Sequence, residues 1–367
     1  MNIFPKIKIL IITVLAFLII NSTFELNENS HTYQNSDTLE FADHWKYNGI
    51  ALQDSGYTIW GASPIMDSLG KTHLFAARWP CNLKVDPGWR THSEIAHYIA
   101  DKPNGPFRFN QVIGRGKHNS KWNSAGFHNP SISRIDDNYI IVYIANDGSS
   151  NHGPNQRIGM LISKSLYGPW KETPDEDEPL LRPPDDSTYW CYNSGCGVNN
   201  PTLIKHPNGK YYLYFKAMSG PRPQGKISMG LAISEKLEGP YIIQKNRIMS
   251  NDRIIEDGFA FYYKGKICLL TTDNHGMIEE GGGILWYSED GMNFNRYEKG
   301  FHRLSDYVDV DFDKVKVHYG PHNLNYAKIE RPQILIVDEK PKYLYGASGI
   351  NIYGGDCTVN YVFKFLE

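Results

Sequence analysis

One supersecondary unit recurs along this chain and constrains its fold more than any other feature. Each copy opens with a short entry motif, most often containing proline, and continues through β-rich runs towards a closing turn. The five entries are Ser63-Pro64-Ile65, Asn129-Pro130-Ser131, Asn200-Pro201-Thr202, Asp257-Gly258-Phe259 and Arg331-Pro332-Gln333. They lie 57 to 74 residues apart, which suits one four-stranded blade with long loops. The repeat therefore predicts an all-β, five-bladed β-propeller.

Local signals inside the copies fit blades of this kind. Hairpin turns rich in Asp, Asn and Gly fall within residues 134–143, 205–214 and 262–270, and these residue types adopt positive φ most readily. Later strands are expected over residues 94–100, 157–162, 229–233 and 284–287. The first three of them lead to Gly-Pro-aromatic turns at residues 105–107, 168–170 and 239–241. A β-sandwich also has strands at regular spacing, but only a propeller explains the long repeat.

The N-terminus carries the pattern of a secretory signal. Lys6 and Lys8 precede an apolar run over residues 9–20, and a polar stretch follows it. The run is shorter than the roughly 20 apolar residues that a membrane helix needs. We therefore expect a signal peptide over residues 1–22, export to the periplasm or the medium, and no further contact with a membrane.

The rest of the chain is expected to form a single domain. Residues 343–346 and 361–365 supply the last predicted strands, and no full blade follows the fifth entry. A propeller usually closes its ring with a strand from the other end of the chain. We therefore expect the N-terminal segment, residues 23–50, to complete the last blade, and the propeller itself to occupy residues 51–367.

Composition excludes several classes of partner. The 38 Lys and Arg residues nearly balance the 40 Asp and Glu residues, for a net charge of −2, so there is no electrostatic case for nucleic acid or an anionic membrane. The five cysteines are an odd number and imply no disulfide framework; at most, Cys191 and Cys196 would close a short loop. Neither a zinc nor a redox CxxC spacing occurs. We expect a monomer.

Several of these motifs resemble those of the five-bladed β-propeller glycosidases, the group of glycoside hydrolase family 43 and its relatives. The resemblance covers roughly residues 55–350 and rests on the Asn-Pro entries, on the strand at residues 210–214 and on the closing turns. It implies a carbohydrate-active enzyme. In that family an Asp-Pro pair in the first blade supplies the general base, whereas the matching position here is Ser63 before Pro64. Acids occur instead at the later entries.

The entry residues are the candidates for chemistry because the inner strands of a propeller converge on its central channel, near one mouth. Glycoside hydrolysis needs two carboxyl groups, one protonated and one ionised. The candidate catalytic residues are Glu256, Asp257, Glu330, His128 and Glu94. Structural roles stay open for three of them: Glu330 would pair with Arg331, Asp257 would cap a turn, and His128 would support the channel or bind a metal.

A second set of candidates is suited to binding substrate. Its members are Arg78, Arg157, Asn200, Lys216 and Arg331. Arginine binds carboxylate or sulfate through two parallel hydrogen bonds, so a cluster of cations indicates an acidic sugar. Single cations at strand ends are also often solvated or paired. The glycine-rich loop over residues 273–283 is a further candidate, which would bring Asp273 or Glu280 to the ligand.

Three functions follow from these residues. The leading one is an exported glycoside hydrolase acting on plant or algal cell-wall polysaccharide fragments, in particular oligosaccharides that carry uronic or sulfated sugars. The second is a lyase or dehydratase in which His128 removes the proton beside a uronate carboxylate, leaving an unsaturated uronic acid. The third is a carbohydrate-binding propeller without catalysis. None requires a cofactor, although a structural cation in the central channel is an option that the sequence does not show.

Overall fold

The structure is a computed structural model of the chain. It describes residues 39–367 except 120, 150–152, 154, 175–176, 250–252 and 318–326. The expected signal peptide and most of the N-terminal segment lie outside the described residues. No helix in the described part of the chain has the length and apolar composition that crossing a membrane requires.

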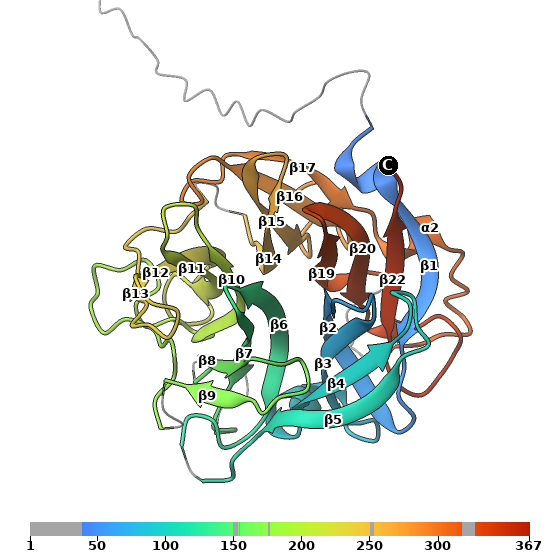
Figure 1. Ribbon diagram of the computed structural model, residues 1–367, viewed down its shortest axis with the longest axis horizontal. Coiled ribbons are helices and arrows are strands. Elements are labelled where there is room, and N and C mark those ends of the chain that lie inside the picture. Colours follow the sequence, from blue (N-terminus) through green and yellow to red (C-terminus); the bar gives the residue numbers. More distant parts are fainter. Residues whose placement is uncertain are drawn as a thin grey trace, which may run out of the picture. The chain divides into compact units, whose positions relative to one another are not determined.

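The described residues form five four-stranded antiparallel sheets that are arranged as the blades of a β-propeller (Figure 1). Blade one contains β2 (Tyr57–Met66), β3 (Thr72–Pro80), β4 (Glu94–Ala100) and β5 (Arg108–Arg115), and blade two contains β6 (Phe127–Ile135), β7 (Asn138–Ala145), β8 (Arg157–Ser163) and β9 (Lys171–Thr173). Blade three contains β10 (Val198–Lys205), β11 (Tyr211–Met218), β12 (Ile227–Ser234) and β13 (Ile242–Ile243), and blade four contains β14 (Glu256–Tyr263), β15 (Lys266–Thr272), β16 (Gly283–Ser288) and β17 (Arg296–Phe301). Blade five contains, in sheet order, β19 (Glu330–Val337), β20 (Lys340–Ala347), β22 (Asn360–Phe365) and β1 (Trp45–Leu52). The predicted fold class is confirmed.

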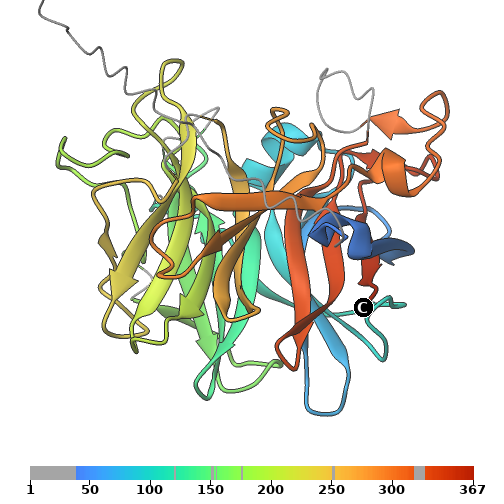
Figure 2. The ribbon, with the colours of Figure 1, turned by 90° about the horizontal axis from the view of Figure 1, so that it is seen from above.

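The smaller elements lie before β1 or in the connections between blade strands. They are η1 (Phe41–His44), α1 (Val85–Thr91), α2 (Leu304–Tyr307) and the strand pair β18 (Lys316–Val317) and β21 (Ile350–Asn351). Figure 2 shows α1 on one side of the propeller and the turn between β2 and β3 on the other. Because α1 packs on β3 and β6, it covers the side at which β6 begins.

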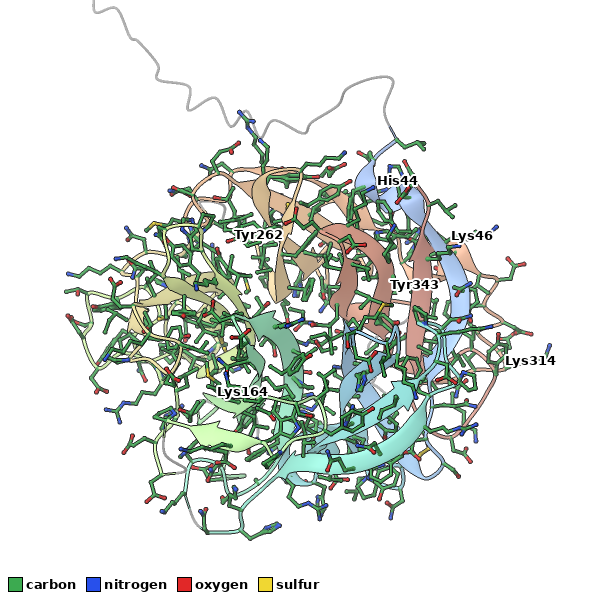
Figure 3. All side chains as sticks on the ribbon, in the orientation of Figure 1. His44, Lys46, Lys164, Tyr262, Lys314 and Tyr343 are labelled. Atoms are coloured by element: carbon green, nitrogen blue, oxygen red, sulfur yellow. A yellow bond between two sulfur atoms is a disulfide. The ribbon has the colours of Figure 1, made fainter. Side chains whose placement is uncertain are left out.

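The apolar core fills the spaces between neighbouring blades. Between blades one and two, Phe75 and Ile95 pack with Phe127 and Tyr143, and all four are buried. Figure 3 shows side chains filling these spaces, with Lys46 at the periphery. The second strands β3 and β7 are buried along almost their whole length, and β7 is accordingly a nearly unbroken apolar run rather than an alternating one.

The two ends of the propeller domain are joined in two ways. β1 pairs with β22 as the outermost strand of blade five, with Trp45 opposite Phe365. A disulfide between Cys81, just after β3, and Cys357, just before β22, links blades one and five. The expectation that Cys191 would pair with Cys196 is wrong, because both are buried free thiols.

All five inner strands carry the same bulge, and it fixes which residues are equivalent. The register shifts between Trp60 and Ser63 in β2, as it does between His128 and Ser131 in β6. The first bulge residue has a positive φ of 49–60° in every blade: Gly61, Asn129, Asn200, Asp257 and Arg331. The alignment of Ser63 with Asn129 was therefore wrong by two residues, since Pro64 lies deeper in β2 and imitates an entry proline. The blade-one equivalent of Asn129 is Gly61.

Candidate functional site

Hydrogen bonds and one charge interaction join the bulges of blades two to five in a circuit, and Gly61 of blade one lies against it. The Asn129 amide donates to Asn200 Oδ1 at 2.8 Å, and the Asn200 amide donates to Asp257 Oδ1. Arg331 Nη2 donates to the Asn129 carbonyl at 3.2 Å. A Cβ on Gly61 would lie 3.2 Å from Asn129 Oδ1 and 3.5 Å from Arg331 Cβ. The structure thus brings four of the sequence-selected entry residues and Gly61 together.

Glu256 precedes the bulge of β14 and lies between two basic side chains. Lys216 Nζ, from β11, is 2.8 Å from Glu256 Oε2, and His275 Nε2 is 3.7 Å from Oε1. Burial alone raises the pKa of Glu256, but Lys216 and His275 outweigh burial and hold that pKa well below its usual range. Burial alone lowers the pKa of Lys216, but Glu256 and Asp257 reverse that effect and raise it. Glu256 is therefore a carboxylate at neutral pH.

Glu330 precedes the bulge of β19 and has the opposite electrostatics. It is 4% exposed, and its Oε1 lies 2.9 Å from Lys328 Nζ and 3.1 Å from the Asn274 amide. Its Oε2 is buried and has no hydrogen-bond partner among the described residues. Burial raises the pKa of Glu330; Lys328 opposes this, while Asp257 and Glu256 add to it. The two glutamates are thus pushed towards different protonation states, which is the arrangement of an acid–base pair.

His128 precedes the bulge of β6 and lies among aromatic rings. Its ring centroid is 5.6 Å from that of Trp79 and 5.3 Å from that of Trp89 on α1. Ser93 Oγ is 3.1 Å from Nδ1. Burial, together with the charges of Arg331 and Lys216, lowers the pKa of His128 to about 3. The imidazole is therefore neutral at physiological pH, and the neighbouring rings bury it.

The loop after β15 supplies two side chains that sequence analysis did not select. The Asp273 carboxylate accepts backbone hydrogen bonds from Met277 and Ile278 at 2.9 and 2.7 Å, so it fixes the loop rather than facing a ligand. Asn274 and His275 are the residues that reach Glu330 and Glu256. The sequence signal was the stretch Asp273-Asn274-His275-Gly276, in which only the acid Asp273 was expected to reach the ligand.

Two of the predicted site residues belong instead to an ion-pair network inside blade one. Arg78 Nε donates to Glu94 Oε1 at 2.9 Å, and Arg78 Nη1 donates to Asp54 Oδ2 at 2.6 Å. The guanidinium carbon also lies 4.1 Å from the centre of the Tyr57 ring. Arg78 and Glu94 face each other across β3 and β4, so the expected catalytic and substrate-binding roles do not fit their positions.

Arg157 also lies away from the inner strands. It begins β8, the third strand of blade two, and its Nη1 donates to the carbonyl of Gln156 at 2.9 Å. Burial lowers its pKa, and the charge of Asp147 partly offsets that effect. Of the five expected binding residues, Asn200, Lys216 and Arg331 are therefore the ones that lie with the glutamates.

A pocket lies among the β3–β4, β5–β6 and β7–β8 connections of blades one and two. Its volume is about 540 Å³, and it is lined by Thr91, His118, Ser124, Ala125, Asp147 and Ser149. Ala125 is three residues before His128, and Thr91 is two residues after Trp89. Most of the lining side chains are polar, as in a site that hydrogen-bonds hydroxyl groups.

One group of possible metal ligands lies elsewhere in the described part of the chain. Glu279, His302 and Asp306 offer ligand atoms within 4.8 Å of one another. Lys299 Nζ lies 2.9 Å from Glu279 Oε2, and Arg303 Nε lies 3.1 Å from Asp306 Oδ1. Protein cations thus already neutralise both carboxylates, and the group is better explained as a structural ion-pair network.

Comparison of structures finds similar proteins, whereas comparison with family models and curated sequences finds none. No protein-family model and no curated protein matches the chain. Zg3597, a family 117 glycoside hydrolase from the marine bacterium Zobellia galactanivorans, matches with a TM-score of 0.62 and 15% identity, over 88% of this chain and 90% of that protein. The chain shares its fold with glycoside hydrolases.

Two further solved structures extend this result. CoXyl43, a family 43 β-xylosidase/α-arabinofuranosidase from a compost metagenome, matches with a TM-score of 0.57 and 15% identity, over 87% of this chain and 94% of that protein. The RGII complex of BT0996 matches with a TM-score of 0.62 and 12% identity, over 87% of this chain and 91% of that protein. The resemblance to the family 43 group is therefore confirmed for the fold.

Proposed function

We propose that this protein is a glycoside hydrolase in which Glu330 is the general acid and Glu256 is the ionised partner, acting as base or nucleophile. The observation that carries the proposal is the opposite electrostatics of the two glutamates at equivalent positions of neighbouring blades. Burial favours the protonated form of Glu330, and Lys216 with His275 favours the ionised form of Glu256. Glycoside hydrolysis requires this division of roles.

The contacts of Glu330 indicate which oxygen carries the proton. Its Oε1 accepts from Lys328 and Asn274, whereas Oε2 has no partner among the described residues. In the proposed reaction, Oε2 gives its proton to the leaving oxygen as the glycosidic C–O bond breaks. Water forms the new C–O bond and gives its proton to Glu256, or it hydrolyses an ester that Glu256 has formed with the sugar.

The strong stabilisation of the Glu256 carboxylate bears on which of these two roles it takes. Groups whose pKa lies far below the working pH are weak general bases. A stabilised carboxylate still serves as a nucleophile or as a negative charge beside the oxocarbenium-like transition state. His275, whose pKa is raised by its hydrogen bond to Glu256, lies where it can exchange a proton with that group.

We further propose that the substrate is a polysaccharide fragment carrying acidic sugars. Lys216, Arg331 and Lys328 balance the three carboxyl groups of the site, and His275 adds a cation when protonated. Structures with this fold are described as complexes with RGII and with xylotriose. The polar pocket among the connections of blades one and two would take a further sugar unit.

Export is part of the same proposal. The N-terminal sequence pattern supports it, and so does the Cys81–Cys357 disulfide, because disulfides persist mainly in oxidising compartments. We place the protein in the periplasm or outside the cell.

The experiment that tests the function is a panel of neutral, uronic and sulfated oligosaccharides incubated with the wild-type protein and with E256Q, E330Q and E94Q. New reducing ends are expected with the wild type and with E94Q, which removes a carboxylate of blade one. Both channel variants should produce few or none. Reducing ends formed equally by all four proteins would exclude the proposed pair.

A second function is supported by His128. The positive charges of Arg331 and Lys216 near this side chain would stabilise the negative charge that forms when the proton next to a uronate carboxylate is removed. Elimination would give a new carbon–carbon double bond conjugated with the carboxylate, which absorbs in the ultraviolet. Rising absorbance in the same panel would replace hydrolysis by elimination through His128, and silence in both assays would leave a carbohydrate-binding propeller.

A further inference from the structure

Arg331 occupies a backbone position that the other blades fill with residues suited to it. The equivalent residues are Gly61, Asn129, Asn200 and Asp257, and all five have positive φ. Glycine, asparagine and aspartate tolerate this conformation, whereas arginine adopts it at an energetic cost. Strained residues of this kind persist where the surroundings require the side chain.

The side chain of Arg331 is held in the interior of the propeller. It is 1% exposed, and burial lowers its pKa to about 10, so it stays cationic at neutral pH. Nη2 donates to the Asn129 carbonyl, while Nε and Nη1 have no hydrogen-bond partner among the described residues. The charge interacts favourably with Asp257.

The stem of Arg331 lies against blade one. A Cβ placed on Gly61 would meet Arg331 Cβ at 3.5 Å and Cγ at 3.6 Å. A longer side chain in blade one would therefore compete with Arg331 for the same space. The glycine at position 61 of blade one and the arginine at the equivalent position of blade five are therefore linked, because the small residue leaves space for the large one.

This arrangement does not fit a cation in the channel. Calcium requires six to eight oxygen ligands in protein sites, but Asn200 Oδ1 and Asp257 Oδ1 already accept hydrogen bonds within the circuit. A guanidinium beside the same oxygens would repel a metal ion. The structural cation that the sequence left as an option does not fit here, because the Arg331 side chain occupies its position.

We propose that Arg331 is the built-in cation of the channel: its guanidinium takes the electrostatic role of a metal ion opposite Asp257, and its stem fills the space above Gly61. The propeller is therefore independent of metal ions.

The test begins with the wild-type protein. After purification without chelators, elemental analysis should find no stoichiometric metal, and the melting temperature should be the same in EDTA and in excess Ca²⁺. A bound metal, or a melting temperature that falls in EDTA and recovers with Ca²⁺, would overturn the proposal. This arm does not depend on whether any variant folds.

Three variants then separate the effect of the positive charge from the effect of the backbone conformation. R331G relieves the unfavourable φ, and R331N copies blades two and three and adds an oxygen ligand. Both remove the guanidinium beside Asp257, so their melting temperatures should rise with Ca²⁺ concentration, most in R331N, as expected for ligand binding to the folded state. R331K keeps a positive charge and should not respond. Folded R331G and R331N proteins that ignore Ca²⁺ would contradict the assignment.

Discussion

Blade one and blade four begin with the same bulged strand, yet their charged residues do different things. In blade one the bulge residue is Gly61, and Arg78 and Glu94 are paired with each other on β3 and β4. In blade four Glu256 precedes the bulge itself and shares the interior with Lys216 and His275. In blade four, Glu256 beside the inner-strand bulge gathers partners from β11 and from the β15–β16 loop, whereas the charged residues of blade one neutralise each other further out in the sheet.

The largest effects on activity are expected from substituting Glu256 and Glu330. An equal effect from a substitution in blade one would contradict the difference between the two blades. E330Q and E256Q should each lower kcat/KM by about a hundredfold or more, the scale of general acid–base catalysis. E94Q should leave kcat/KM of the folded protein within a few-fold. Melting temperatures of all three variants control for folding, and comparable losses in E94Q would contradict the distinction between the blades.

Blade one is expected to matter most for closing the ring. Removing the Cys81–Cys357 disulfide, as in C81S/C357S, should lower the free energy of unfolding by about 2–4 kcal/mol, because the bond links the first blade to the last. Chemical denaturation measures this change. C268S, which replaces a buried free thiol of blade four, is the matched control without a cross-link; equal loss in C268S would mean that packing, not closure, is responsible.

The pH dependence of activity tests how strongly Lys216 lowers the pKa of Glu256 in blade four. Lys216 lowers the pKa of Glu256, so K216M should raise it. Because the proposed reaction needs ionised Glu256, the acidic limb of the kcat/KM profile should move to higher pH, by roughly one unit or more for loss of a close opposite charge. R157M, which removes a cation from a third strand, should leave the limb in place. An unmoved limb in K216M would separate Glu256 from catalysis.

A smaller effect is expected from a buried histidine pair in blade one. His97 Nε2 lies 2.8 Å from His73 Nδ1, and burial, with the charge of His73, lowers the pKa of His97 from 6.5 to about 3. The unfolded chain therefore takes up a proton near pH 6.5 that the folded chain refuses until about pH 3. Stability from this group is complete above that window and decreases as the pH falls through it.

Urea unfolding at a series of pH values checks this slope. H97F should be less sensitive to acid than the wild type, even if it is less stable at neutral pH. His302, whose pKa is raised by Glu279, contributes with the opposite sign, so H302Q should lose stability mainly at low pH. An unchanged slope in H97F would show that other groups control acid stability.

The repeat made the fold predictable because each blade is a local unit. The strand expected over residues 94–100 coincides with β4, and the expected hairpins lie between β6 and β7, β10 and β11, and β14 and β15. The register of blade one failed because Pro64 imitated an entry proline, while the true bulge residue Gly61 carries no distinctive signal. Bulge geometry depends on strand pairing, which a single strand does not reveal.

The site residues predicted from the sequence lie on inner strands, apart from Lys216, which lies on the second strand β11. Glu256, Asp257, Glu330 and Arg331 were found through the repeat, but Asn274 and His275 reach the glutamates from a loop whose course is set by Asp273. The disulfide joins cysteines 276 residues apart, a pairing that depends on ring closure. The pairing of Arg78 with Glu94 across β3 and β4 was not predictable either, because sequence alone does not show which charges face each other.

The most direct test of the account compares two leaving groups on the sugar that the panel identifies. A dinitrophenyl glycoside needs no proton at its leaving oxygen, whereas an oligosaccharide does. E330Q should lose activity on the oligosaccharide and keep most of it on the dinitrophenyl glycoside, while E256Q should lose both. Equal losses on the two substrates in E330Q would contradict its role as the general acid and the division of roles between the two glutamates.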